Sequence, residues 1–222
     1  MKMPLALVDG QRQEPQSEVS GTCICCGDPV VAKCGPKRVW HWAHKNARRC
    51  DPWWENETDW HRHWKGQFPK DWHEKIQYAE DGERHIADVK TDQGWVMEFQ
   101  HSPIKPAERQ AREAFYGKLI WVVDGLSRKR DRPRFLKHWE VGAFAPIGPT
   151  LPVRIFPYEF ALLEEWGGST ASVFFDFGEE EVLWWLLPKR SAKGPAYLAH
   201  FPRAEFIELH RRAATQTEGG FD

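Results

Sequence analysis

The sequence predicts a mixed α/β protein, of the α+β kind, and three neighbouring stretches carry this prediction. Residues Ile86–Ser102 alternate apolar and polar side chains on both sides of a polar turn, which is typical of a half-buried β-hairpin. Pro106–Tyr116 follows with Pro at its first position, as many helices begin. Leu119–Asp124 is a continuous apolar run of strand length, which indicates a central strand buried on both faces.

Length and composition exclude several classes of protein. The chain has 222 residues, which suits one or two domains, and its formal net charge is −1. Any grip on nucleic acid must therefore come from a local patch of cations. No apolar run is long enough to span a bilayer, and the apolar stretch at the N-terminus is too short for a secretory signal. We expect a cytoplasmic protein without a membrane partner.

All five cysteines lie between Cys23 and Cys50, which favours metal binding over disulfides because the number is odd and no export signal precedes them. A Cys-x-x-Cys-Gly turn of this kind presents two thiolates to one ion. We expect a structural zinc site made of Cys23, Cys26, His44 and Cys50, with His41 or Cys25 as substitutes for one ligand. The alternative is a module of reduced thiols held together by tryptophan packing.

Trp54–Phe68 reads as an amphipathic helix that precedes the strand expected at Trp72–Tyr78. Glu57, His61 and Lys65 recur at i, i+4 and i+8, so they share one stripe of that helix. On the pattern alone, this stripe is a solvated face with i,i+4 pairing.

The hairpin carries acidic residues in an otherwise apolar setting. Two adjacent strands can bring Asp88 and Glu98 together, with Gln100 one pleat further on. A buried carboxylate is costly unless it is paired or holds a cation, and magnesium is held by one or two carboxylates plus substrate phosphate. The alternative is a surface hairpin with both acids on its wet face.

Cationic side chains that could contact DNA phosphates fall in two places. Arg109 and Arg112 lie on the predicted helix after the hairpin, where they could equally be ordinary helix-surface residues. Arg128–Arg134 is the most basic stretch, and Arg128, Lys129 and Arg130 begin it. Such a stretch is either a solvated loop or a contact to the nucleic-acid backbone.

Beyond Phe135 the sequence predicts a β-rich region. Strands are expected at Val173–Phe177 and Val182–Leu187, a short helix at Glu159–Trp166 and a last helix at Pro202–Ala214.

Several of these segments, in order, resemble the competence protein CoiA family, a branch of the PD-(D/E)xK nuclease superfamily. The resemblance covers about residues 20 to 125. The motifs that carry it are the Cys-x-x-Cys-Gly turn, His-Trp-Ala-His at 41–44, Glu57-Thr-Asp-Trp-His61 with Lys65, Glu83–Asp88, Glu98–Ile104, Arg109, Arg112, Tyr116 and Ile120–Asp124.

This resemblance implies a restriction-endonuclease-like core with an N-terminal zinc-finger-like module. The expected divisions are residues 1–52 for an N-terminal arm and that module, 53–134 for the nuclease core and 135–222 for a C-terminal subdomain. It also implies that Glu57 faces Asp88 and Glu98 around Mg²⁺ or Mn²⁺. His61 and Lys65 then contact phosphate or a metal-bound water, and Gln100 replaces the usual lysine of the superfamily motif.

The function expected from this is a metal-dependent nuclease that hydrolyses DNA in recombination, transformation or phage-related DNA processing. Its partners would be DNA and either a second copy of the chain or a recombination or phage protein. Two other hypotheses compete: a DNA-binding module that keeps the fold without catalysis, and a protein-interaction adaptor built on the zinc module and the Trp-rich C-terminal region.

Overall fold

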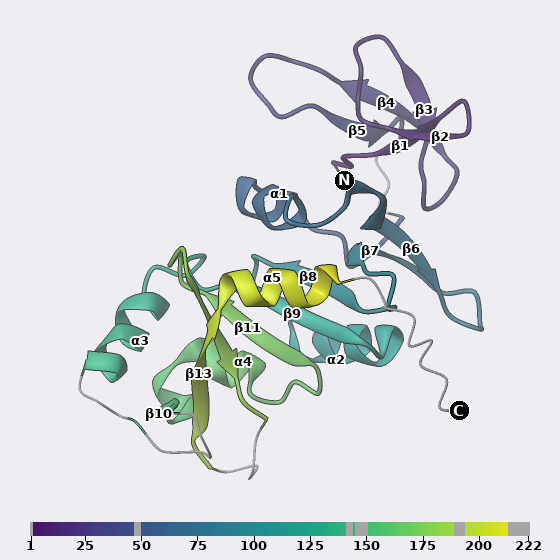
Figure 1. Ribbon diagram of the computed structural model, residues 1–222. Coiled ribbons are helices and arrows are strands. Elements are labelled where there is room, and N and C mark those ends of the chain that lie inside the picture. Colours follow the sequence, from purple (N-terminus) through teal and green to yellow (C-terminus); the bar gives the residue numbers. More distant parts are fainter. Residues whose placement is uncertain (1, 47–49, 141–143, 145–150, 189–193, 213–222) are drawn as a thin grey trace, which may run out of the picture.

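The computed structural model describes residues 2–46, 50–140, 144, 151–188 and 194–212. They form two β-sheets, of five and eight strands, with helices against the larger one, so the mixed α+β class predicted from the sequence is confirmed. Figure 1 shows the small N-terminal sheet at one end of the molecule, beyond helix α1 (Asp59–Lys65) and strand β6 (His73–Tyr78).

The small sheet is antiparallel, in the strand order β2-β1-β3-β4-β5. Its strands are β1 (Ala6–Val8), β2 (Gln11–Gln13), β3 (Ser20–Thr22), β4 (Pro29–Lys33) and β5 (His41–His44). Trp42 of β5 is fully buried in the core of this module and exchanges two backbone hydrogen bonds with Met3, of 2.8 and 2.9 Å. The first strand agrees with the strand expected at Leu5–Val8, but the residues after it, expected as an arm or loop, form the second strand of a hairpin with it.

The large sheet has the strand order β10-β13-β12-β11-β9-β8-β7-β6. Its strands are β6, β7 (Arg84–Lys90), β8 (Val96–Gln100), β9 (Leu119–Asp124), β10 (Val153–Ile155), β11 (Ser172–Asp176), β12 (Val182–Leu186) and β13 (Ala196–Pro202). The predicted hairpin is β7–β8, and the predicted central strand is β9, which lies parallel to β8 and to β11. The region from residue 135 onward therefore extends the same sheet with four strands, β10 to β13. Of these β13 was not predicted, and β10 lies within Trp139–Pro157, which was expected to be loop-rich with short strands.

The helices lie on both faces of this sheet. They are α1, α2 (Pro106–Tyr116), α3 (Asp131–Glu140), α4 (Ala161–Trp166) and α5 (Arg203–Arg211), with 3₁₀ turns at Lys70–Trp72 and Pro157–Glu159. Trp121 and Val123 of β9 belong to a core with side chains of α3 and α4. Ile120 and Val122 belong to a second core with side chains of α1 and α5. Alternate side chains of one strand thus serve two cores, as burial on both faces requires.

Three predicted segments differ from the structure. The helix expected over Trp54–Phe68 begins only at Asp59, because Thr58 caps it: the Thr58 hydroxyl accepts from the His61 backbone N–H, and His61 Nδ1 accepts from the Thr58 N–H. The basic stretch Arg128–Arg134 enters α3 at Asp131, and fully buried Phe135 anchors that helix to the sheet. The last helix ends at Arg211, and residues 213 and 214 lie outside the described part of the chain.

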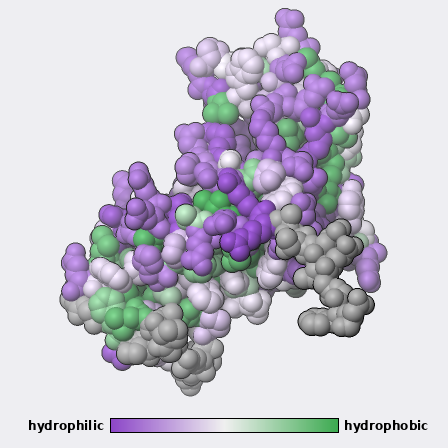
Figure 2. Space-filling model, viewed as in Figure 1, coloured by the Kyte–Doolittle hydropathy of each residue, from purple (hydrophilic) through white to green (hydrophobic). Residues whose placement is uncertain are grey.

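Hydrophilic side chains cover much of the face shown in Figure 2. Within the residues described, no helix combines the length and apolarity that crossing a lipid bilayer requires.

Candidate functional site

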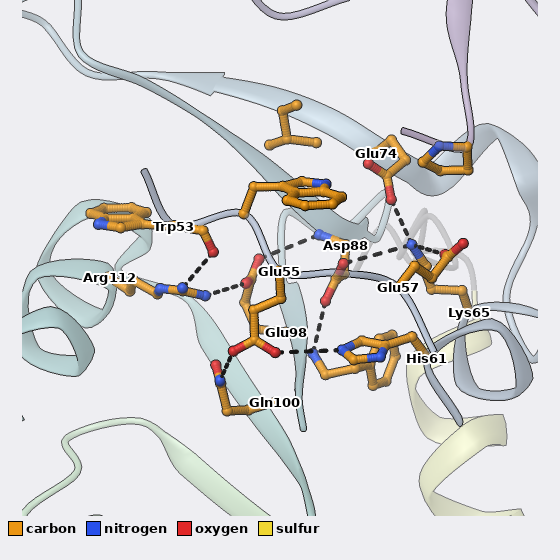
Figure 3. Close-up of a pocket in the computed structure, with 14 residues that line it drawn as sticks. Trp53, Glu55, Glu57, His61, Lys65, Glu74, Asp88, Glu98, Gln100 and Arg112 are labelled. Carbon is orange, nitrogen blue, oxygen red and sulfur yellow. Dashed lines mark hydrogen bonds and ion pairs between the residues drawn. The ribbon is translucent and has the colours of Figure 1, made fainter. Parts of the chain in front are cut away.

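A pocket lies where β6, β7 and β8 meet the chain that leads into α1, and acidic side chains line it (Figure 3). We call this the acid pocket and define it by its five carboxylates, Glu55, Glu57, Glu74, Asp88 and Glu98.

Asp88 and Glu98 are brought together where the ladder of β7 and β8 stops. The backbone register pairs Lys90 with Val96 and Val89 with Met97, so Asp88 comes next opposite Glu98. From there side chains replace backbone partners: the Asp88 N–H donates to Glu98 Oε1 at 3.3 Å, and the Phe99 N–H donates to Asp88 Oδ2 at 3.0 Å. The strand ends are therefore held apart by carboxylates, which leaves oxygen atoms between the strands.

Glu74 joins these acids from the neighbouring strand. The register of β6 with β7 passes from His73 and Val89 to Lys75 and Ala87, and skips Glu74 and Asp88. Glu74 has a φ of 50°, a left-handed conformation that costs free energy in a residue other than glycine and is concentrated at functional sites. This local departure from strand geometry turns the Glu74 carboxylate into the pocket.

Lys65 of α1 holds three of the carboxylates. Its Nζ lies 2.5 Å from Glu57 Oε1, 2.6 Å from Glu74 Oε1 and 3.8 Å from Asp88 Oδ1. The lysine is only 5% exposed, and burial alone would lower its pKa. Glu74, Asp88 and Glu57 outweigh burial and raise the pKa of Lys65 above its ordinary value. Glu57 thus meets Lys65 although it precedes the helix on which it was expected.

Arg112 of α2 is the second cation of the pocket. Its guanidinium donates to Glu98 Oε2 at 3.2 Å, to Glu108 Oε1 at 2.6 Å and to the Trp53 carbonyl oxygen at 2.6 Å. Burial raises the pKa of Glu98 well above its ordinary value, nearby Asp88 raises it further, and Arg112 only partly offsets them. Glu98 therefore holds a proton more readily than an exposed glutamate, because Arg112 only partly compensates its ionised form beside Asp88.

Three further side chains complete the lining of the pocket: Gln100, Glu55 and His61. The Gln100 amide nitrogen donates to the Glu55 carboxylate and, at 2.8 Å, to the Ser102 carbonyl oxygen. His61 Nε2 lies 4.0 Å from Glu55 Oε2, and burial lowers the pKa of His61 and raises that of Glu55. A neutral His61 that accepts the Thr58 N–H at Nδ1 carries its own hydrogen on Nε2, which faces Glu55.

All six residues predicted for the nuclease centre line this one pocket: Glu57, His61, Lys65, Asp88, Glu98 and Gln100. Sequence reasoning missed Glu55, Glu74 and the role of Arg112 as a pocket residue. Glu74 follows a 3₁₀ turn at the start of a strand, and Glu55 lies in irregular chain, so neither is marked by periodicity.

The residues predicted to contact DNA are scattered. Arg109 is 2% exposed and pairs with Glu113 at 2.6 Å, and Arg112 is 3% exposed in the acid pocket, so neither lies on a surface that DNA could touch. Arg128 pairs with Glu165. Lys129 and Arg130 are exposed just before α3 and stay candidates for phosphate contacts.

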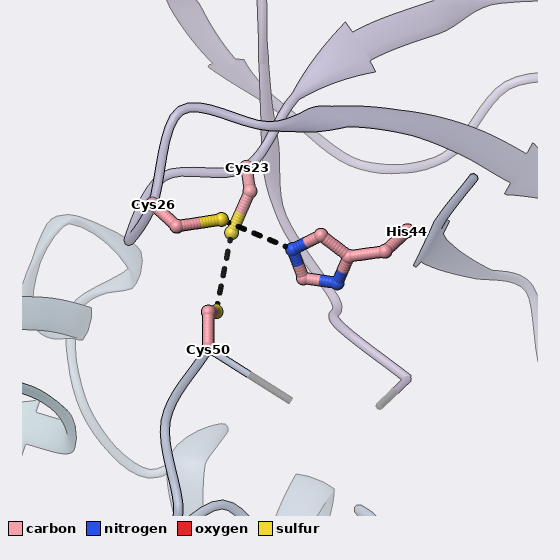
Figure 4. A group of neighbouring side chains, drawn as sticks. All are labelled: Cys23, Cys26, His44 and Cys50. Carbon is pink, nitrogen blue, oxygen red and sulfur yellow. Dashed lines mark hydrogen bonds between the residues drawn. The ribbon is translucent and has the colours of Figure 1, made fainter. Parts of the chain in front are cut away.

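The second site is the thiol cluster, which consists of Cys23, Cys26, His44 and Cys50 (Figure 4). Their ligand atoms all lie within 4.8 Å of one another, and these are the four ligands predicted from the sequence. Cys23 Sγ lies 3.7 Å from Cys50 Sγ, and Cys26 Sγ lies 3.2 Å from His44 Nε2. Three sulfurs and one imidazole match the donor set of a structural zinc ion, so the cluster could hold such a metal.

A tight turn over Cys23–Gly27 places the Cys23 and Cys26 thiols near each other. The Gly27 N–H donates to the Cys23 carbonyl oxygen at 2.9 Å, and Gly27 has a φ of 75°, which favours glycine. The hydrogen bond between Cys23 and Cys50, together with burial, raises the pKa of the Cys23 thiol. A bound cation reverses this preference because metal ligation requires the thiolate.

Comparison with known proteins identifies the N-terminal part of the chain. Residues 11–52 match the family model described as "Competence protein CoiA, N-terminal domain", which confirms the family resemblance over the module that carries the thiol cluster. No curated protein and no solved structure gives a match.

Proposed function

We propose that this chain, whose residues 11–52 match the N-terminal domain of the competence protein CoiA family, is a metal-dependent nuclease that hydrolyses DNA phosphodiester bonds in a competence-related process. The observation that carries this proposal is the acid pocket, where four of five carboxylates pair with only two cations, Lys65 and Arg112. A group of carboxylates this buried is costly to ionise completely unless a further cation enters.

The order of elements supports a restriction-endonuclease-like core. Helix α1 is followed by the antiparallel strands β6, β7 and β8, then by the crossover helix α2 and the parallel strand β9. The acids of the pocket come from the middle of this unit, and the region beyond β9 extends the sheet on the far side.

The acid pocket offers the kind of ligand atom that a magnesium or manganese ion takes. Carboxylate oxygens are the ligands that these hard cations prefer, and the pocket has a volume of about 40 Å³, which is room for an ion with one or two waters. Asp88 and Glu98 would hold the ion, with Glu57, Glu74 or Glu55 nearby. When bound, it would lower the pKa of a water and neutralise charge on the phosphate.

The protein's own side chains would perform the remaining tasks. Lys65 keeps Glu57 and Glu74 in place and offers its positive charge to a phosphate oxygen next to Asp88. Arg112 fixes Glu98 through a charge-assisted hydrogen bond. Neutral His61 can donate a hydrogen bond from Nε2 to water or to a phosphate oxygen.

Incubation of the pure protein with plasmid, linear and single-stranded DNA, each with magnesium, with manganese or with neither metal added, tests the proposal. We expect cleavage only with a divalent metal, and a loss of at least about 100-fold in Asp88→Asn and Glu98→Ala, as for other transition-state charge stabilisers. Asp92→Ala is the matched control, since Asp92 is an exposed acid on the turn of the same hairpin. Absence of cleavage in every metal, or full activity in both pocket variants, would overturn the proposal.

One observation favours a second candidate, a DNA-binding module of the same fold without catalysis. Lys65 and Arg112 already pair with most of the carboxylates, so the pocket can keep its shape without a metal. This candidate expects salt-sensitive DNA binding, no cleavage and no magnesium or manganese binding by calorimetry.

A further inference from the structure

A groove separates the N-terminal sheet from α1 and β6, and it opens onto the acid pocket. Its volume is about 890 Å³. One wall comes from the N-terminal module and includes Leu5, Arg12 and Trp40, and the other includes Arg62 and Lys75. Glu57, Lys65 and Glu74 line both the groove and the acid pocket, so the two cavities are continuous.

The groove presents an aromatic platform. Trp40 is 50% exposed and Val39 beside it is 56% exposed, although most large apolar side chains of the described residues are buried. Pro4, Leu5 and Pro15 continue the apolar wall. A half-exposed indole in a groove is suited to stack on an unpaired nucleobase, because every base offers a π-face.

Cations surround this platform although the whole chain is close to neutral. Those that line the groove or the smaller hollow beside Trp40 are Lys2, Arg12, Arg38, Arg62, Lys70 and Lys75. Among these cations, Lys70 pairs with Glu14, and Arg62 pairs with Glu57 and Asp59. The carboxylates on the same walls are Glu14, Asp71, Glu57 and Glu74, and the last two also pair with Lys65. The accessible walls thus carry more positive than negative charge, which complements a phosphate backbone.

Burial of the acid pocket limits the form of nucleic acid that can reach it. The side chain of Asp88 is 24% exposed, that of Glu57 15% and that of Glu98 8%. A stiff duplex can bring its phosphates only to the mouth of so recessed a site, whereas a single strand bends at each nucleotide.

We propose that the groove binds an unpaired nucleic-acid strand, with a base stacked on Trp40 and the adjoining backbone led by the groove cations to the acid pocket. This inference deepens the proposed nuclease function and rests on it for the chemistry, but binding itself needs no catalysis. The shared chemistry of single-stranded DNA and RNA is what the groove recognises.

Fluorescence anisotropy without magnesium or manganese, and without a chelator that could remove zinc from the thiol cluster, tests the groove apart from cleavage. The probes are a labelled oligothymidylate, an oligouridylate of the same length and a DNA duplex. We expect both single strands to bind more tightly than the duplex. Trp40→Ala should weaken single-strand binding about tenfold or more, while Trp40→Phe keeps most of the affinity. Trp95→Ala, which removes another exposed indole outside the groove, is the control.

A second variant tests the cations. Lys75→Ala should lower the slope of log affinity against log salt by about 0.7, because one phosphate contact to a single strand is lost. Unchanged zinc content and thermal midpoint show that each variant is folded. Equal affinity for duplex and single strand, or equal effects of Trp40→Ala and Trp95→Ala, would overturn the inference.

The two proposals fail separately. If single strands bind through Trp40 but nothing is cleaved with any metal, the groove stands and the nuclease proposal fails. If cleavage depends on Glu98 but Trp40→Ala changes neither affinity nor cleavage, the nuclease stands and the groove inference fails. Preference for RNA over DNA supports the groove and corrects the substrate of the proposed nuclease.

Discussion

The thiol cluster and the acid pocket lie at the two ends of one short segment, residues 50–57. They differ in whether the protein itself supplies cations to balance the negative charge of the ligand groups. The thiol cluster brings four ligand atoms together without a side-chain cation among its members. The acid pocket contains Lys65 and Arg112, which pair with its carboxylates. We infer that the first site depends on a metal for its stability, whereas the second can persist without one and bind a metal as part of its chemistry.

The link between the two sites is itself well defined. Asp51 follows Cys50 and is 2% exposed. Its carboxylate accepts from the Trp53 and Ile86 N–H groups, both at 2.9 Å, and lies 2.8 Å from His85 Nδ1. The Trp53 ring stacks on His85 with centroids 3.2 Å apart. The segment that leads from the thiol cluster to Glu55 is therefore fastened to β7.

The largest expected effect is loss of the metal at the thiol cluster. Cys26→Ser, or a strong zinc chelator, should unfold the N-terminal sheet, because binding of structural zinc contributes on the order of 10 kcal/mol to small domains. Elemental analysis should find one zinc in the natural chain and none in the variant, with a lower thermal midpoint. Cys34→Ser, outside the cluster, is the control. A zinc-free protein with an unchanged thermal midpoint would contradict the inference that the thiol cluster depends on a metal for its stability.

The next effect comes from the built-in cation of the acid pocket. Lys65→Met leaves Glu74 buried without Lys65, and leaves Glu57 with only Arg62 at 3.7 Å, so we expect a loss of about 3–5 kcal/mol in the free energy of unfolding at neutral pH. Urea unfolding measures it. Lys70→Met is the matched control, because the Lys70 side chain is 87% exposed in its pair with Glu14. Equal stability of the two variants would show that the pocket does not need its lysine.

A smaller loss is expected from Asp51→Ala in the link. The change removes the acceptor of two backbone N–H groups, and because both are only partly buried we expect a cost of about 1–3 kcal/mol in total. Hydrogen exchange should rise at Trp53 and Ile86 while zinc remains bound. If the Trp53 and Ile86 amides lose their protection from hydrogen exchange only when zinc is also lost, the thiol cluster and the acid pocket unfold as one cooperative unit. The two sites would then not differ in their dependence on a metal.

The smallest effect concerns pH. Because the folded pKa of Glu98 is raised above its ordinary value of 4.5, the folded state holds a proton that the unfolded state has released. Glu98 therefore costs stability as pH rises from about 4.5 through the folded pKa, by up to about 1.4 kcal/mol per pH unit. Glu98→Gln should be the more stable protein at neutral pH and equal to the natural chain near pH 4. Thermal melts across this range measure the difference, and magnesium should reduce it.

The amino-acid sequence by itself determined the thiol cluster, the β7–β8 hairpin, helix α2 and the central strand β9. Clustered cysteine and histidine indicate a metal site because these residue types bind metal ions. Hairpins and buried strands can be predicted because the spacing of apolar residues along a short stretch differs between them. Asp88 and Glu98 belong to one hairpin, so their meeting follows from the turn between them.

Only the tertiary structure decided the rest of the acid pocket and the groove. Glu74 enters through an irregular step in the pairing of β6 with β7, and Glu55 and Arg112 are brought in by chain that is distant in sequence. Thr58 caps the first helix, so Glu57 lies outside it, yet the side chain of Lys65 still forms an ion pair with Glu57. The physical reason is that strand neighbours and buried ion pairs depend on how elements pack, and packing leaves no period in the sequence.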